Sequence, residues 1–346
     1  MTITEQKAFL RSYTGQAQAP ADFAQRWQET AAALHPAVSC APVAFGNPCG
    51  VYERLTVTFD GRSVTARVIH PAAGGVHPLL LMYHDLNRGV RGWHHMTRFL
   101  ALGFGVVALE AEPFREDWKV QPAQAAFRQR YLDALAVAKA ALALPWVDTG
   151  RVYTFGEGFG GGLALLAASF CPAVSRCAAL NPLPGDFAGL GLPGYDELDA
   201  ANFAPLCRAE VLLGTCLMDE YAPPKGQAAI YNRLTCPKQW KLYPKYVHER
   251  VNFFENQMLC FFKDGILEAQ GTPCLKQHRS ASICTFPTAR QNAATAIFIR
   301  PPVRAACRRA TWTRCCGNWR KTPAAPTRCT LAAAPRHCWC PRRRRL

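Results

Sequence analysis

The chain has 346 residues and a formal net charge of +16, but this charge is not spread along it. From Cys274 to Leu346 there are 14 arginines, 2 lysines and no acidic residue, so this segment carries the entire excess and residues 1–273 are formally neutral. The charge therefore excludes a generally basic, nucleic-acid-binding surface on the first part of the chain, whose length is ample for one sizeable core.

The first part also lacks the segments that direct a chain to a membrane. No N-terminal stretch resembles a signal peptide, and no apolar run reaches the ~18 residues that span a bilayer. We therefore expect a cytoplasmic protein with reduced thiols and no membrane partner. The cysteine and histidine spacings there match no zinc site, so neither a metal nor another cofactor is expected.

The C-terminal segment needs its own interpretation. It holds half of the 16 cysteines, among them Cys315-Cys316, and ends in the run Arg342 to Arg345. A GC-rich gene read out of frame would give such a composition. The alternatives are an arginine-rich arm that neutralises phosphates and a cysteine/histidine metal module, although the spacing fits no ligand pattern. We divide the chain into a domain at 1–268 and a basic tail at 269–346, disordered or frameshift-derived, and do not expect nucleic acid as the partner.

In chain order, the first elements predicted are helices and then strands. Residues 1–35 are amphipathic and helical, with a turn at Pro20 to Asp22. Asp60-Gly61 between two alternating apolar runs predicts a two-residue hairpin. The remaining predictions of this region are helix Phe23–Leu34, strands Leu55–Phe59, Val64–Ile69 and Leu79–Tyr83, helix Trp93–Leu102 and strand Gly105–Leu109.

From residue 123 onward, helices and apolar strands alternate. The predicted elements are helix Ala123–Leu144, strand Val152–Phe155, helix Gly162–Ser169, strand Cys177–Leu180, strand Val211–Thr215, helix Pro223–Leu234, strand Gln239–Leu242 and a helix at 251–262. The Pro/Gly-rich segment 182–206 interrupts them as a lid or insert. Continuous apolar strands separated by helices predict an α/β fold with a parallel sheet covered on both faces.

A glycine-dense turn between strand and helix carries the first functional signal. Gly156-Glu157-Gly158-Phe159-Gly160 has the layout of a nucleophile elbow, Gly-x-Ser-x-Gly, in which a strained turn exposes a serine oxygen above the sheet. Flanking glycines are needed because the turn crowds the strand against the helix. The central position, however, is Gly158, which has no side chain.

Two further candidates follow the ends of predicted strands. Asp219 comes after Val211–Thr215 and His248 begins the loop before the last helix. Open α/β sheets place their sites at these strand ends, and the order nucleophile, acid, histidine is that of α/β-hydrolases. The alternative reading is a structural loop acid and a surface histidine. His84, His94 and His95 are interpreted as packing or surface residues rather than metal ligands.

An ordered series of short motifs resembles the acetyl xylan esterase / cephalosporin C deacetylase family of carbohydrate esterases. These motifs are Pro20-Ala-Asp-Phe-Ala-Gln-Arg-Trp27, Tyr83-His84, Leu144-Pro-Trp-Val-Asp148, Asn202-Phe-Ala, Leu217-Met-Asp219-Glu-Tyr-Ala-Pro-Pro224, Tyr231-Asn232 and Tyr243-Pro-Lys-Tyr-Val-His248-Glu249. The resemblance covers roughly residues 15 to 265. It implies an α/β-hydrolase fold with a mostly parallel central sheet, a cytoplasmic location, a small acetylated carbohydrate or similar ester as ligand, deacetylation as the reaction, and a hexamer as the assembly.

Carried over by residue, the resemblance makes Asp219 the triad acid and His248 the general base. It assigns the backbone N–H groups of Leu86 and Phe159 to the oxyanion hole, a role that survives side-chain change. Two motifs depart from the family: the nucleophile position is Gly158, and Glu110-Ala111-Glu112-Pro113 replaces an Arg-Gly-Gln.

These departures leave two hypotheses. In the first, the protein is a catalytically impaired or non-catalytic ligand-binding homologue. In the second, it is an active carboxylic ester hydrolase in which a His248-activated water fills the space left at Gly158. If Asp219 and His248 are aligned, a serine restored at 158 should raise the rate by orders of magnitude. Nucleic-acid binding through the tail is a third, lower-ranked class.

Overall fold

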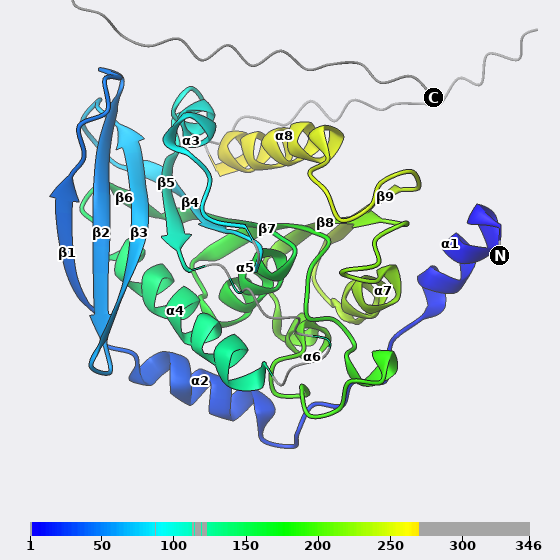
Figure 1. The fold of residues 1–346 in the computed structure, drawn as a ribbon. Coiled ribbons are helices and arrows are strands. Elements are labelled where there is room, and N and C mark those ends of the chain that lie inside the picture. Colours follow the sequence, from blue (N-terminus) through cyan, green and yellow to red (C-terminus); the bar gives the residue numbers. More distant parts are fainter. Residues whose placement is uncertain (1, 87, 113, 115–118, 120–122, 270–346) are drawn as a thin grey trace, which may run out of the picture. The chain divides into compact units, whose positions relative to one another are not determined.

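A computed structural model describes residues 2–269 except 87, 113, 115–118 and 120–122 (Figure 1). The predicted tail, apart from residue 269, lies outside the described residues. None of the helices within the described part is both long and apolar enough to cross a bilayer.

The described residues form one nine-stranded sheet of order β1-β2-β3-β5-β4-β6-β7-β8-β9. Strands β4 to β9 run parallel to one another, whereas β1, β2 and β3 pair antiparallel, as do β3 and β5. The mostly parallel sheet expected from the sequence is thus confirmed. The strands are β1 Ala37–Pro42, β2 Gly50–Phe59, β3 Arg62–Pro71, β4 His77–Tyr83, β5 Gly105–Glu110, β6 Val147–Glu157, β7 Val174–Leu180, β8 Glu210–Cys216 and β9 Lys238–Tyr243.

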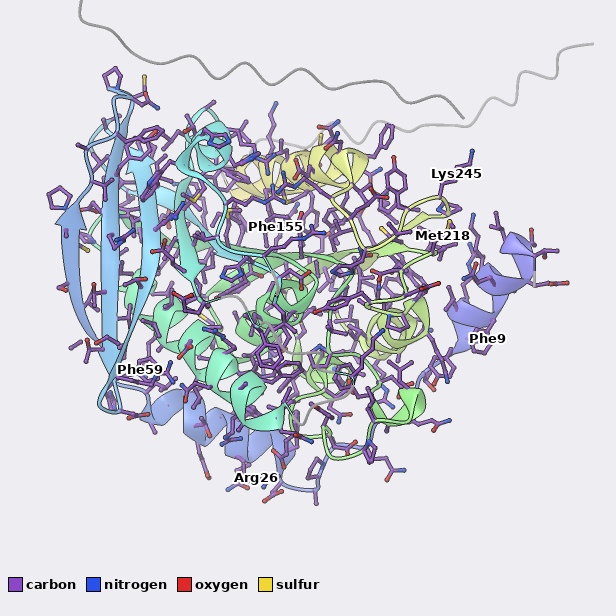
Figure 2. The ribbon with its side chains drawn as sticks, viewed as in Figure 1. Phe9, Arg26, Phe59, Phe155, Met218 and Lys245 are labelled. Carbon is purple, nitrogen blue, oxygen red and sulfur yellow. The ribbon has the colours of Figure 1, made fainter. Side chains whose placement is uncertain are left out.

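Helices cover both faces of this sheet (Figure 1), and each face has its own hydrophobic core. Apolar side chains of α3 and α8 pack on one face, and those of α2, α4 and α5 pack on the other. Figure 2 shows the side chains that fill these layers, with Phe155 of β6 in the interior. The helices are α1 Ile3–Ser12, α2 Phe23–Ala33, α3 Trp93–Leu100, α4 Gln124–Leu142, α5 Phe159–Phe170, α6 Ala200–Phe203, α7 Pro224–Arg233 and α8 Asn252–Ala269.

The predicted hairpin is present, and an additional edge strand is not among the predictions. Phe59 pairs with Arg62, so Asp60 and Gly61 form a two-residue turn, and their φ angles of 47° and 71° are those of the turn type that matches strand twist. Strand β1 was missed because all its residues are exposed, which removes the alternation of apolar and polar residues that marks a half-buried strand.

The segment 182–206 is a packed insert rather than a loose lid. Residues 181–187 and 198–204 are buried, and the carboxylate of Asp199 accepts hydrogen bonds from the amides of Asp186, Phe187 and Ala201. Asp186 in turn accepts hydrogen bonds from the N-terminal segment, including one from the amide of Ala17 at 2.9 Å. These bonds hold the insert against the N-terminal segment of the chain.

Candidate active site

The strand-to-helix turn predicted from the glycines is present where β6 meets α5. Gly158 has φ 55° and ψ −125°, a backbone conformation that favours glycine. A Cβ atom on Gly156 would lie 1.9 Å from the carbonyl oxygen of Gly160, and one on Gly160 would lie 2.3 Å from that of Tyr83. The flanking glycines are therefore required by close backbone approach, as the elbow layout implies.

Asp219 and His248 meet above the ends of the parallel strands. Asp219 lies just after β8 and is 3% exposed, and its Oδ2 is 2.7 Å from Nδ1 of His248 in the loop between β9 and α8. The other oxygen of Asp219 accepts hydrogen bonds from the amides of Tyr221 and Ala222. This arrangement fixes the orientation of the imidazole, as the acid of a catalytic triad does.

The second nitrogen of His248 meets a residue that the sequence analysis did not single out. Nε2 lies 2.6 Å from Oδ2 of Asp85, in the loop that follows β4. The Asp85 side chain is 1% exposed, so this is a buried ion pair rather than a surface contact. The histidine thus lies between two carboxylates, from loops far apart in the chain.

The Asp85 carboxylate also accepts hydrogen bonds from both candidate oxyanion-hole amides. Oδ1 of Asp85 accepts hydrogen bonds from the N–H groups of Leu86 and Phe159, each at 2.9 Å. Two donors at 2.7–3.1 Å from one oxygen is the geometry expected of an oxyanion hole. The structure therefore brings Leu86, Phe159, His248 and Asp219 together, with Asp85 at their centre.

Asp85 also fills the space above Gly158. A Cβ atom at position 158 would lie 2.1 Å from Oδ1, 2.3 Å from Cγ and 2.6 Å from Oδ2 of Asp85. This geometry does not favour the alternative hypothesis in which a water fills the space left at Gly158, because the Asp85 carboxylate stands there. An acidic residue beside a candidate oxyanion-hole amide, in His84-Asp85-Leu86, was the signal in the sequence that could have identified it.

The two carboxylates set the protonation of His248, and His248 in turn sets that of Asp85. Burial lowers the pKa of His248, but hydrogen bonds and charge from Asp219 and Asp85 outweigh burial and raise it to about 9. Burial raises the pKa of Asp85, yet the hydrogen bond and charge of His248, with the amides of Phe159 and Leu86, hold it below its ordinary value. At neutral pH the site is an imidazolium that donates to a carboxylate on each side.

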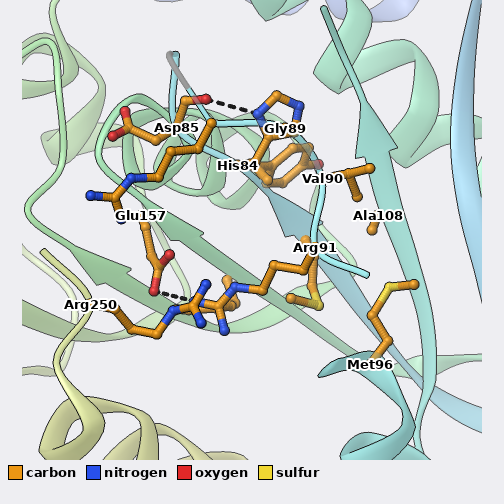
Figure 3. A pocket seen from close by; sticks show the side chains of 13 residues that line it. His84, Asp85, Gly89, Val90, Arg91, Met96, Ala108, Glu157 and Arg250 are labelled. Atoms are coloured by element: carbon orange, nitrogen blue, oxygen red, sulfur yellow. Dashed lines mark hydrogen bonds and ion pairs between the residues drawn. The ribbon is translucent and has the colours of Figure 1, made fainter. Parts of the chain in front are cut away.

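Two further polar residues next to the site, Glu157 and His84, are held by partners of their own. Glu157, next to Gly158, turns away toward Arg91 and pairs with its guanidinium (Figure 3). His84 accepts a hydrogen bond from the amide of Ala111 at Nε2, so Nδ1 carries the proton that it donates to the carbonyl of Asp85. Burial lowers the pKa of His84, which keeps it neutral. His84 therefore supports the loop, in line with its interpretation as a packing residue.

The segment that replaces Arg-Gly-Gln has a structural role at the end of β5. Glu110 accepts hydrogen bonds from Arg67 at 2.9 and 3.1 Å and from Thr65 at 3.2 Å, both on the neighbouring strand β3. Its carboxylate thus ties two strands together.

Among the residues that the structure describes, no group of three or more histidine, cysteine or acidic side chains is placed to hold a metal ion.

A pocket opens beside Asp85, on the face of the sheet that carries α3 (Figure 3). Its enclosed volume is about 40 Å³, and the larger space up to its open mouth includes solvent. The apolar part is lined by Met82, Met96, Ala108 and Phe155, and the polar part by Arg88, Arg91, Glu157 and Arg250. This combination of apolar and polar side chains is typical of sites that bind small organic ligands.

Comparison with known proteins relates the chain to one family. The model of the acetyl xylan esterase family matches residues 4–115, 119–190 and 193–265. Over 126 residues the chain is 28% identical to the acetyl esterase Axe7A of Xylanibacter ruminicola, a match that covers 30% of this chain and 29% of that protein.

Two solved structures of the same description share the fold. Acetyl xylan esterase 1 from Thermoanaerobacterium sp. JW/SL YS485 is 24% identical with a TM-score of 0.67, covering 76% of this chain and 98% of that one. The acetyl xylan esterase from Paenibacillus sp. R4 is 20% identical with a TM-score of 0.66, covering 76% and 99%.

Proposed function

Because the chain belongs to the acetyl xylan esterase family, we propose that its α/β-hydrolase domain keeps the family's ester-binding site but no longer deacetylates through a serine. The observation that carries this proposal is Asp85: its carboxylate stands directly above Gly158, bonded to both amides and to His248. The serine mechanism needs a nucleophile, a base and oxyanion donors. Here the serine nucleophile is absent, and the base His248 and both oxyanion-hole amides are hydrogen-bonded to Asp85.

The expected loss of hydrolytic rate follows from what the serine, the oxyanion hole and substrate binding each contribute to catalysis. Removing the serine of a triad costs about 10⁶ in kcat and leaves roughly 10³ over water, supplied by binding and the oxyanion hole. In this protein the oxyanion donors are already hydrogen-bonded to Asp85, so even that residual rate enhancement over water is reduced. We expect no useful hydrolysis of acetyl esters.

The geometry works against the alternative in which His248 activates a water. A general base must be neutral and must have a free nitrogen to accept a proton. The pKa of His248 is raised to about 9, and its Nε2 lies 2.6 Å from Asp85. Both requirements are unmet near neutral pH, so the non-catalytic reading is the one that the site supports better.

The ligand that we propose is a small acetylated carbohydrate or a similar ester. Family membership supports this class, and the pocket beside Asp85 has the mixed apolar and polar lining for it. Arg88 and Arg250 at the pocket would donate hydrogen bonds to sugar or acetyl oxygens.

Hydrolysis of p-nitrophenyl acetate by the full chain tests the loss of catalysis. We expect the wild-type rate to equal that of the His248→Ala variant, because His248 is not available as a base. A wild-type rate that is clearly higher and disappears in His248→Ala would overturn the proposal. Binding is measured separately by NMR titration with acetylated xylose, and the absence of any saturable shift would contradict the ligand-binding part.

A further inference from the structure

We propose that Asp85 is a built-in ligand of this site: its carboxylate occupies a cradle for small monocarboxylates and thereby closes the oxyanion hole to esters. The inference rests on the proposed function because it concerns the same site, but it adds that the chain itself occupies the oxyanion hole beside the ligand pocket. The missing serine alone does not have this consequence.

The cradle around the Asp85 carboxylate is complete and shielded from water. Oδ1 of Asp85 has two amide donors at 2.9 Å, and Oδ2 has the imidazole at 2.6 Å. The side chain is 1% exposed, so water does not compete for these donors. Amide and imidazolium donors converging on two oxygens of one group match the shape of any carboxylate, including a free one.

The charged groups around His248 favour a carboxylate in this cradle. The groups that face it are Asp219 after β8, Asp85 after β4, the ring of Tyr221 with its centroid 4.6 Å away, and Arg88, whose guanidinium donates to the His248 carbonyl. The imidazolium and the Asp219 carboxylate alone form a neutral pair, so the Asp85 carboxylate gives the three groups a net charge of −1. The amides of Leu86 and Phe159 and Nε2 of His248 donate to that extra negative charge, and the same three donors would hold a free carboxylate in the place of Asp85.

The elbow has no room for both a side chain at 158 and the Asp85 carboxylate. Any side chain at 158 must begin 2.1 Å from Oδ1 of Asp85, so its entry displaces a carboxylate held by three hydrogen bonds. The earlier expectation that Gly158→Ser alone restores activity is therefore revised. The serine and the carboxylate exclude each other.

The direct test is acetate binding to Asp85→Ala. We expect saturable binding with a dissociation constant on the order of 0.1–10 mM, as suits four heavy atoms, and no binding to the wild type. Isothermal titration and the His248 imidazole resonances in NMR would record it. Sodium chloride at the same concentration is the control. No acetate binding to a folded Asp85→Ala, or equal binding of chloride, would overturn the proposal.

The variant Asp85→Asn provides a second test that does not depend on whether Asp85→Ala folds. It keeps the volume but loses the charge, so the pKa of His248 should fall from about 9 toward its ordinary value of 6.5. Glu110→Gln is the matched control, because it neutralises a carboxylate at the neighbouring strand end that bonds to Arg67 and not to His248. A His248 pKa unchanged in Asp85→Asn would show that Asp85 does not hold the imidazolium.

Restoring the serine gives a second, kinetic readout. We expect Gly158→Ser alone to remain near background in p-nitrophenyl acetate hydrolysis, and the double variant Gly158→Ser/Asp85→Ala to exceed it at least 100-fold. A single variant as fast as the double one would contradict the mutual exclusion, and so would a double variant no faster than the single one. Activity of the wild-type chain would instead contradict the proposed function, so the two failures are distinguishable.

Discussion

At the scale of single residues, a carboxylate and a serine make opposite demands on the histidine beside them. A serine gives its proton to the imidazole as it attacks, so the imidazole must start neutral. A carboxylate stabilises the imidazolium and raises its pKa, as Asp85 does to His248. Under the proposed function, glycine at 158 leaves no nucleophile and the Asp85 carboxylate converts His248, the candidate base, into a cation.

The ion pair makes the stability of the fold depend on pH. The folded pKa of His248, about 9, is above its ordinary value of 6.5, so its contribution is fully present below pH 6.5 and is lost as the pH rises through 9. The folded pKa of Asp85 is depressed, so its contribution is present above its ordinary value of 3.8 and is lost as the pH falls through the folded pKa.

We therefore expect the melting temperature of the wild type to fall between pH 6.5 and pH 9 more steeply than that of Asp85→Asn. The measurement is thermal unfolding in a pH series at constant ionic strength, followed by circular dichroism. Parallel curves for the two proteins in this window would show that the pair contributes nothing to stability.

At the scale of elements, the turn between β6 and α5 has the layout of the elbow although glycine, not serine, stands at its centre. The amide of Gly158 donates to the carbonyl of Leu180 at 2.9 Å, and its carbonyl accepts from the amide of Leu183 at 3.0 Å. The turn thus ties β6 and α5 to the end of β7 and the insert that follows. The glycines are retained for packing, which explains why the elbow is recognisable without its serine.

The Gly156→Ala variant tests this structural role. Its Cβ atom would stand 1.9 Å from the carbonyl oxygen of Gly160, so strand and helix must separate, and we expect a loss of about 3 kcal/mol or more in the free energy of unfolding. Gly74→Ala, where a Cβ meets nothing within 4 Å, is the matched control and should change stability by less than about 1 kcal/mol. Denaturant unfolding of both variants decides between these outcomes.

At the scale of the whole molecule, the site is assembled by three loops that are distant in sequence. Asp85, Asp219 and His248 follow strands β4, β8 and β9, and the elbow follows β6 between them in the sheet. A parallel sheet brings the carboxyl ends of its strands to one edge, which is why these loops meet. Arg91 and Arg98 hold the adjacent region together through Glu255 of α8, at 2.8 and 2.6 Å.

The domain boundary leads to a prediction for the tail. A chain ending at residue 268 should melt within about 2 °C of the full chain, because the described cores contain no residue beyond Phe262. Its binding to duplex DNA at low salt should be weaker than that of the full chain if the arginines of the tail bind phosphates. Loss of cooperative unfolding on truncation would contradict the boundary.

Much of the fold could be predicted because its signals are local. Apolar runs, the Asp60-Gly61 turn and the glycines around position 158 each report their own conformation, and the structure confirms the elements they predict. The positions of Asp219 and His248 at strand ends could also be read from the chain. The exposed strand β1 could not, because solvent on both sides leaves no pattern in its residues.

The sequence by itself determined the α/β sheet, the elbow and the absence of a serine from it. Only the tertiary structure decided what stands in the serine's place. Asp85 and His248 are 163 residues apart, and no local pattern records that their side chains meet. That contact depends on the order and register of strands β4, β6, β8 and β9, which set the distances between the loops to within hydrogen-bonding range.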